Sequence, residues 1–110
     1  MTLGESQRKF TKMVGYLIGW AYANGYELTM GEGYRTPVQA LVYARQGKGI
    51  VDSLHCDRLA IDFNVFKDGQ WLQSGEQFID LCEYWESIGG SSGVRFKDGN
   101  HFSLSVGGRK

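Results

Sequence analysis

The stretch SLHCDRLAID, from Ser53 to Asp62, decides the architecture of this chain because it joins a polar turn to the start of a strand. A fully extended chain from His55 to Asp62 would span roughly 23–25 Å, so the backbone must turn if both side chains are to reach one metal ion. After the turn, apolar residues alternate with small or polar ones, as in a half-buried strand. One face carries Leu59, Ile61, Phe63 and Val65, and the other carries Ala60, Asp62 and Asn64.

A second stretch, DGNHFS from Asp98 to Ser103, leads into the same kind of pattern. Here the apolar face carries Phe102, Leu104 and Val106, and the polar face carries His101, Ser103 and Ser105. Asp62 and His101 therefore each occupy the polar face of a strand whose other face is core. If the two strands pair, both side chains project into one cleft.

The chain has only 2 histidines, His55 and His101, and each has a carboxylate close by in sequence. Two neutral imidazoles and one carboxylate form the ligand set that leaves a tetrahedral zinc with an open position for water. A remaining carboxylate is then free to act as general base on that water, which predicts a zinc hydrolase. We expect one zinc ion per chain, bound by His55, Asp62 and His101.

Two alternatives remain open within these stretches. Asp98 lies shortly before His101 and can approach the same ion, but Asp57 is a rival for the role of general base. Cys56 is a candidate fourth ligand, and a fourth protein ligand would close the site and make it structural.

The same residues carry a family resemblance. The first stretch resembles the Ser-X-His-(six residues)-Asp signature of the zinc D-alanyl-D-alanine carboxypeptidases of the VanY type and of the phage L-alanyl-D-glutamate endopeptidases, which are endolysins. Their superfamily also includes VanX-type dipeptidases and the Hedgehog signalling domain. Asp98–His101 resembles the Asp/Glu-X-X-His element of that family. Gly33-Tyr34-Arg35-Thr36, followed by Gln39, Tyr43 and Gln46-Gly47, is similar to its Tyr-Arg-Thr/Ser stretch and the next helix.

The resemblance implies a role for each matched residue. His55, Asp62 and His101 become zinc ligands, and Asp98 becomes the catalytic base and acid. Arg35 contacts the substrate or the developing oxyanion, and a guanidinium suits that role because it stays charged and presents a planar fork of donors. Ser53 supports the site or contacts substrate. Taken alone, Arg35 predicts a surface arginine paired with Glu32 or Glu27.

This chain also departs from the family pattern. Arg58 stands where the family usually has glycine, Ser91-Ser92-Gly93 where it often has tryptophan, and Ser103 where it commonly has glutamate or glutamine. None of these positions is a predicted ligand. The departures therefore bear on which peptide bond is cleaved and on the shape of the pocket wall.

The whole chain, residues 1–110, predicts a single zinc peptidase domain of the α+β class. We expect a small antiparallel sheet with helices packed on one face, similar to the Hedgehog and D-Ala-D-Ala peptidase fold. A capping box at Thr2–Glu5 precedes a helix over 6–24. Further helices are expected over 37–46 and 76–88, and strands over 26–30, 94–96 and 101–106. Asp68-Gly69 predicts a hairpin turn.

Composition narrows the class of partner. The 110 residues include 12 basic and 12 acidic side chains, so no basic surface for nucleic acid is indicated. No apolar run approaches the ~20 residues needed to span a bilayer. Cys82 falls in an apolar helical stretch and is expected to be a core thiol. We expect a monomer that acts on peptidoglycan peptides, without contact to nucleic acid or membrane.

The N-terminal stretch from Met1 to Phe10 lacks the pattern of a signal peptide, so cytoplasmic synthesis is expected. An enzyme for the cell wall would then reach its substrate after phage-mediated release or from a virion. Among activities we favour L-alanyl-D-glutamate endopeptidase, followed by D-alanyl-D-alanine carboxypeptidase. A catalytically silent wall-binding module and a metal nuclease are the remaining alternatives.

Overall fold

The computed structural model describes residues 1–49, 53–93 and 99–106. Its elements in chain order are α1 (Leu3–Ala23), β1 (Tyr26–Met30), α2 (Pro37–Arg45), η1 (Leu54–Asp57), β2 (Ala60–Lys67), β3 (Gln70–Leu72), η2 (Gly75–Phe78), α3 (Ile79–Ser87), β4 (Ser91–Ser92) and β5 (His101–Ser103). The strands form one antiparallel sheet in the order β1-β2-β5-β4, with β3 also paired to β2. The α+β class with an antiparallel sheet is confirmed.

The strand β2 organises the sheet. One of its edges pairs with β1, from Phe63 to Lys67. Gly31 and Glu32, which follow β1, continue along this edge with backbone hydrogen bonds to Asp62, so β5 and β3 share the other edge. Along it β5 pairs with Ala60–Asp62, and β3 pairs with Val65–Lys67. The β2–β3 turn has φ +52° at Asp68 and φ +77° at Gly69, which fits the predicted hairpin turn with two left-handed residues.

Helix α1 begins at its capping box. The Thr2 hydroxyl accepts a hydrogen bond from the Glu5 backbone N–H (3.1 Å), and the Glu5 carboxylate accepts one from the Thr2 N–H (3.0 Å). These bonds satisfy N–H groups that have no partner inside the helix. The helix therefore starts at Leu3, earlier than the expected residue 6. Its buried stripe repeats at helical spacing and holds Ser6, Phe10, Met13, Leu17 and Ala21.

Trp85 of α3 lies at the centre of the core and is fully buried. Phe10 and Phe102 contact it edge-on, with ring centroids 5.8 and 6.0 Å away. Its indole N–H donates to the carbonyls of Ser91 (3.1 Å) and Ser103 (3.0 Å). The buried indole thus ties α3 to both β4 and β5, and it fixes the strand that carries His101. Cys82 is fully buried beside it, as predicted.

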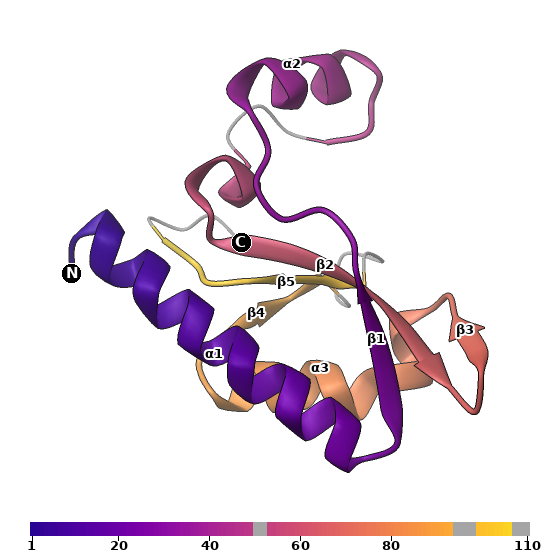
Figure 1. The fold of residues 1–110 in the computed structure, drawn as a ribbon. Helices are drawn as coiled ribbons and strands as arrows, with labels where there is room; N and C mark the ends of the chain where they lie inside the picture. The colour runs from indigo at the N-terminus through magenta and orange to yellow at the C-terminus, as the bar shows by residue number, and fades with distance from the viewer. Residues whose placement is uncertain (50–52, 94–98, 107–110) are drawn as a thin grey trace.

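Helices α1 and α3 lie together on one side of the sheet, whereas α2 stands on the other side, away from both (Figure 1). The expectation of helices on one face therefore holds for α1 and α3, with α2 as the exception. The expected third helix is divided into η2 and α3, and β5 is shorter than the expected strand over 101–106. The predicted strand over 94–96 lies outside the described residues. No helix in the described part of the chain combines the length and the apolar character that crossing a membrane requires.

Candidate metal centre

His55 is placed by a short, well-capped turn. The Ser53 hydroxyl accepts a hydrogen bond from the His55 backbone N–H (3.1 Å) at the start of η1. The His55 ring is almost fully buried, and its Nδ1 lies 2.7 Å from the Gly33 carbonyl oxygen. Since a carbonyl only accepts, Nδ1 carries a proton, which leaves Nε2 as the nitrogen that can bind a metal ion. This is the arrangement by which a second hydrogen bond orients a metal-binding histidine.

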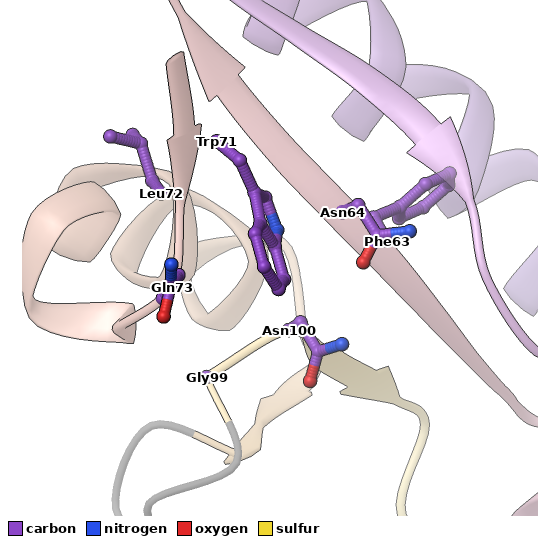
Figure 2. Close-up of a pocket in the computed structure, with 7 residues that line it drawn as sticks. All are labelled: Phe63, Asn64, Trp71, Leu72, Gln73, Gly99 and Asn100. Atoms are coloured by element: carbon purple, nitrogen blue, oxygen red, sulfur yellow. The ribbon is translucent and has the colours of Figure 1, made fainter.

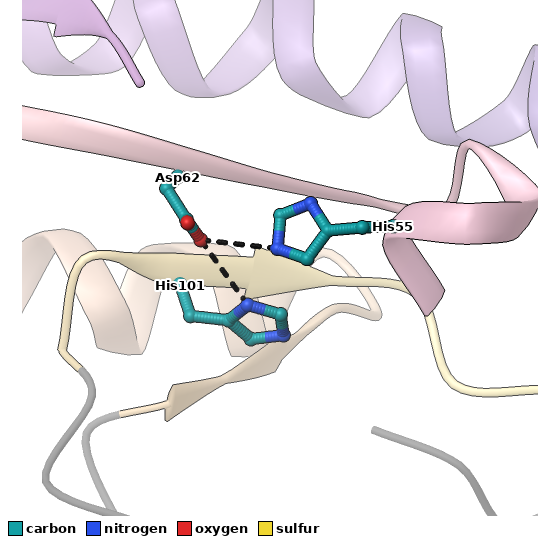
Figure 3. Close-up of side chains that lie close together, drawn as sticks. All are labelled: His55, Asp62 and His101. Atoms are coloured by element: carbon teal, nitrogen blue, oxygen red, sulfur yellow. Dashed lines mark hydrogen bonds and ion pairs between the residues drawn. The ribbon is translucent and has the colours of Figure 1, made fainter. Parts of the chain in front are cut away.

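Asp62 and His101 meet through strand pairing. They are direct partners in the β2–β5 register, so their side chains leave the sheet on the same face. Asp62 Oδ1 lies 3.2 Å from His101 Nδ1 and 3.3 Å from His55 Nε2 (Figure 3). The predicted pairing of the two strands is confirmed, and it brings the Asp62 and His101 side chains into contact.

The three side chains have the geometry of a metal ligand set. Their candidate ligand atoms all lie within 4.8 Å of one another. Ligand atoms about 2.0–2.1 Å from a tetrahedral zinc are roughly 3.3 Å apart, which matches both distances from Asp62. Two imidazole nitrogens and one carboxylate oxygen also suit zinc chemically, and three protein ligands leave one position open. The described residues can therefore hold a divalent metal ion here.

The electrostatics of the site also favour binding of a cation. Burial by itself would raise the pKa of Asp62, but hydrogen bonds to His101 and His55 lower it to about 2. Burial would likewise lower the pKa of His55, yet its hydrogen bonds to Asp62 and to the Gly33 carbonyl raise it overall. The carboxylate thus stays charged and attracts a positive charge. A metal ion must compete with a proton for the His55 imidazole, which makes binding dependent on pH.

Arg35 lies beside this centre. Its Nε donates to Glu32 Oε1 (2.8 Å), its Nη2 makes an ion pair with the same oxygen, and its Nη1 donates to Ser53 Oγ (3.3 Å). Its guanidinium also lies over the Tyr43 ring, 5.0 Å from the centroid. The pairing with Glu32 that Arg35 alone suggested is therefore present, and the same side chain is held at the site.

A cavity of about 370 Å³ opens at this place, lined by Glu32, Arg35, Tyr43, Lys48 and Asp62. It connects a candidate metal ligand with two cationic side chains, Arg35 and Lys48. Sequence reasoning did not single out Lys48, because a lysine in a glycine-rich loop carries no signal of its own.

The remaining sequence candidates have different outcomes. Cys56 is outside the group of ligand atoms found among the described residues, and its Sγ lies 4.0 Å from the Thr36 carbonyl oxygen. The structure thus gives no support to Cys56 as a fourth ligand. Asp57 lies in η1, where its backbone carbonyl accepts a hydrogen bond from Gln7 Nε2 (2.8 Å). Asp98 lies outside the described residues, so its role stays a prediction.

Arg58 follows η1 in a left-handed backbone conformation, with φ +56°. This conformation explains why glycine would suit the position, since glycine adopts it without steric cost. Here the arginine stacks on Tyr34 instead, with its guanidinium carbon 4.1 Å from the ring centroid. The stacking contact offsets part of the backbone strain.

Gly31 positions Asp62 through a close backbone contact that the sequence analysis did not identify. Its N–H donates to the Asp62 carbonyl (2.7 Å), and a Cβ at this position would lie 2.9 Å from that oxygen. Only glycine lets the two backbones approach so closely. The glycine is visible in the sequence, but its partner across the sheet is not.

Comparison with known proteins adds one finding. No protein-family model matches the chain, and no curated protein sequence matches it. Among solved structures, the crystal structure of Serratia marcescens L-Ala D-Glu endopeptidase ChiX superposes with a TM-score of 0.73. The match covers 93% of this chain and 85% of that chain, with 16% sequence identity.

The fold is peptidase-like. At this identity the likeness concerns the fold alone, and it agrees with the fold that the sequence resemblance implied. The candidate metal centre is inferred from the side chains of this chain alone.

Proposed function

We propose that this protein is a zinc-dependent peptidase that hydrolyses the stem peptide of peptidoglycan, cutting between L-alanine and D-glutamate. The observation that carries the proposal is the gathering of His55, Asp62 and His101 around one point, with ligand atoms 3.2 and 3.3 Å apart. The likeness in fold to an L-Ala D-Glu endopeptidase supports the choice of bond. Delivery to the wall by phage-mediated release or from a virion belongs to the same proposal.

Each side chain then has a task. His55, Asp62 and His101 hold the metal, and the Gly33 carbonyl keeps His55 in the tautomer that binds it. When bound, zinc supplies a Lewis acid that activates a water molecule for attack near neutral pH. Asp98 accepts the proton of that water and later passes a proton to the leaving amine. Asp57 is the rival for this role.

Arg35 and Lys48 supply positive charge next to the metal ligands. The Arg35 guanidinium is held by Glu32 and Ser53, so it is oriented before substrate arrives. It can donate to the oxygen on which negative charge develops, and losing one such donor typically costs about 3–4 kcal/mol of transition-state stabilisation. The cavity is also lined by the carboxylates of Glu32 and Asp62, and its two cations can pair with a substrate carboxylate such as that of D-glutamate.

The test is mass spectrometry of the fragments released from purified peptidoglycan by the zinc-loaded protein. Cleavage at the proposed bond releases peptides that begin with D-glutamate and leaves L-alanine on the glycan. The His101→Ala variant serves as the control and should release none. Release of D-alanine alone would identify a D-alanyl-D-alanine carboxypeptidase instead. Binding to the wall without release of any fragment would identify a silent binding module.

A further inference from the structure

A second pocket lies beside the candidate metal centre. It has a volume of about 250 Å³ and opens where the shared edge of β2 passes from β5 to β3. Figure 2 shows the indole of Trp71 standing among the side-chain amides of its neighbours. The residues that matter for its chemistry are Asn64, Trp71, Gln73 and Asn100.

Strand register relates this pocket to the metal centre. Asn64 follows Asp62 by two positions on β2, so both side chains leave the same face about 7 Å apart. Trp71 is the partner of Phe66, which lies on that face as well. Asn100 immediately precedes His101. The pocket therefore lies along β2 from the metal centre, roughly 7–13 Å from Asp62.

The lining points to a neutral, hydroxyl-rich ligand. Trp71 is 55% exposed although it is among the largest apolar side chains of the protein. An exposed indole next to amides offers a flat apolar surface beside groups that both donate and accept hydrogen bonds. The hydrogen bond from Asn64 Nδ2 to Thr29 Oγ1 (3.2 Å) holds one of these amides in place. The described lining carries no charged side chain, in contrast to the cavity that contains Arg35 and Lys48.

We propose that this pocket is a saccharide subsite that binds the N-acetylated amino sugar to which the stem peptide is attached. The inference rests on the proposed function and extends it from a peptide to a glycan-linked peptide. The apolar face of a sugar ring would stack on Trp71. Its hydroxyl and acetamido groups would pair with the amides of Asn64, Gln73 and Asn100.

The length of the substrate agrees with this placement. In peptidoglycan, L-alanine is joined directly to the lactyl group of a muramic acid residue. For a cut after L-alanine, the sugar lies about one residue plus the lactyl group from the scissile bond, or roughly 7–10 Å at ~3.3 Å per residue. A cut between the two terminal D-alanines would put the sugar more than ~15 Å away, beyond this pocket.

The experiment compares two substrates that differ only in the sugar. One is the tripeptide L-Ala-D-Glu-diaminopimelate with its amino group capped by a lactyl group, and the other is the same lactyl peptide on N-acetylglucosamine, that is, on N-acetylmuramic acid. We expect Trp71→Ala to lower kcat/KM for the muramyl peptide about 5- to 30-fold, the usual loss for an aromatic binding anchor. Its kcat/KM for the lactyl-capped tripeptide should stay unchanged. Tyr16→Ala removes an aromatic ring of similar exposure from α1 and is the matched control. Equal effects of Trp71→Ala on both substrates would refute the subsite.

A binding measurement keeps this proposal distinguishable from the proposed function. The disaccharide GlcNAc-MurNAc is titrated into the parent protein while the Trp71 indole N–H is followed by NMR, with Trp71→Ala giving the assignment. A saturable shift of that signal supports the subsite even if neither substrate is cleaved, in which case the proposed activity is wrong. An unmoved Trp71 signal at millimolar disaccharide overturns the subsite, whatever the cleavage assay shows.

Discussion

Replacing Gly31 by alanine tests whether the Gly31–Asp62 contact positions the metal ligand. The new Cβ would lie 2.9 Å from the Asp62 carbonyl oxygen and 3.2 Å from the Asp62 Cβ. Carbon atoms prefer separations of about 3.5 Å or more, so the two segments must part by roughly half an ångström. Two backbone hydrogen bonds, Gly31 N–H to Asp62 O (2.7 Å) and Asp62 N–H to Glu32 O (2.9 Å), resist that movement.

The displacement therefore reaches Asp62, which contacts both histidines of the site. Inserting a methyl group into packed structure typically costs about 1–3 kcal/mol of folding free energy. Disturbing the support of a metal ligand typically lowers metal affinity about 10- to 100-fold. We expect Gly31→Ala to show both effects. Zinc affinity is measured by competition with a chromophoric chelator, and stability by urea unfolding in EDTA, where bound metal makes no contribution.

Gly33→Ala is the matched control. It lies in the same segment, and a Cβ there would meet no atom within 4 Å. Its carbonyl remains available to His55, so it should bind zinc and unfold like the parent. If Gly31→Ala bound zinc as tightly as Gly33→Ala and unfolded at the same urea concentration, the close approach would have no role in placing Asp62.

Further predictions concern the ligands, the base and pH. His101→Ala should lose most of its zinc in elemental analysis, and full retention would remove His101 from the site. Asp98→Asn should keep zinc yet lose about 10²–10⁴-fold in peptidase activity. Asp62→Asn should bind zinc more weakly, so added zinc should restore part of its activity. If Asp57→Asn were inactive and Asp98→Asn fully active, Asp57 would be the base. Burial and the hydrogen bond to Asp80 raise the pKa of Tyr26 to about 12 from 10.0. Folding therefore favours the protonated phenol, and that stabilisation is complete below pH 10 and is lost as pH rises through 12. Urea midpoints should fall across this window in the parent and less in Tyr26→Phe; equal slopes would contradict the assignment.

Features encoded by neighbouring residues could be predicted from the sequence. The capping box at Thr2, the Asp68-Gly69 turn and the helix beginning at Pro37 depend on contacts within a few residues, and all are present. Alternation along β2 placed Asp62 on the face away from the core. The metal ligands could also be proposed from the sequence, because a chain with only 2 histidines offers few combinations of ligands.

The tertiary structure alone decided how these parts meet. The register that sets Asp62 opposite His101 depends on long-range pairing, which strand periodicity permits but does not specify. The Gly33 carbonyl that orients His55 is a backbone group, so no side chain in the sequence marks it. The closeness of Gly31 to Asp62 and the meeting of Trp71 with Asn100 also join residues far apart in the chain. Local sequence fixes which face each side chain occupies, whereas only the packed sheet fixes which faces share a site.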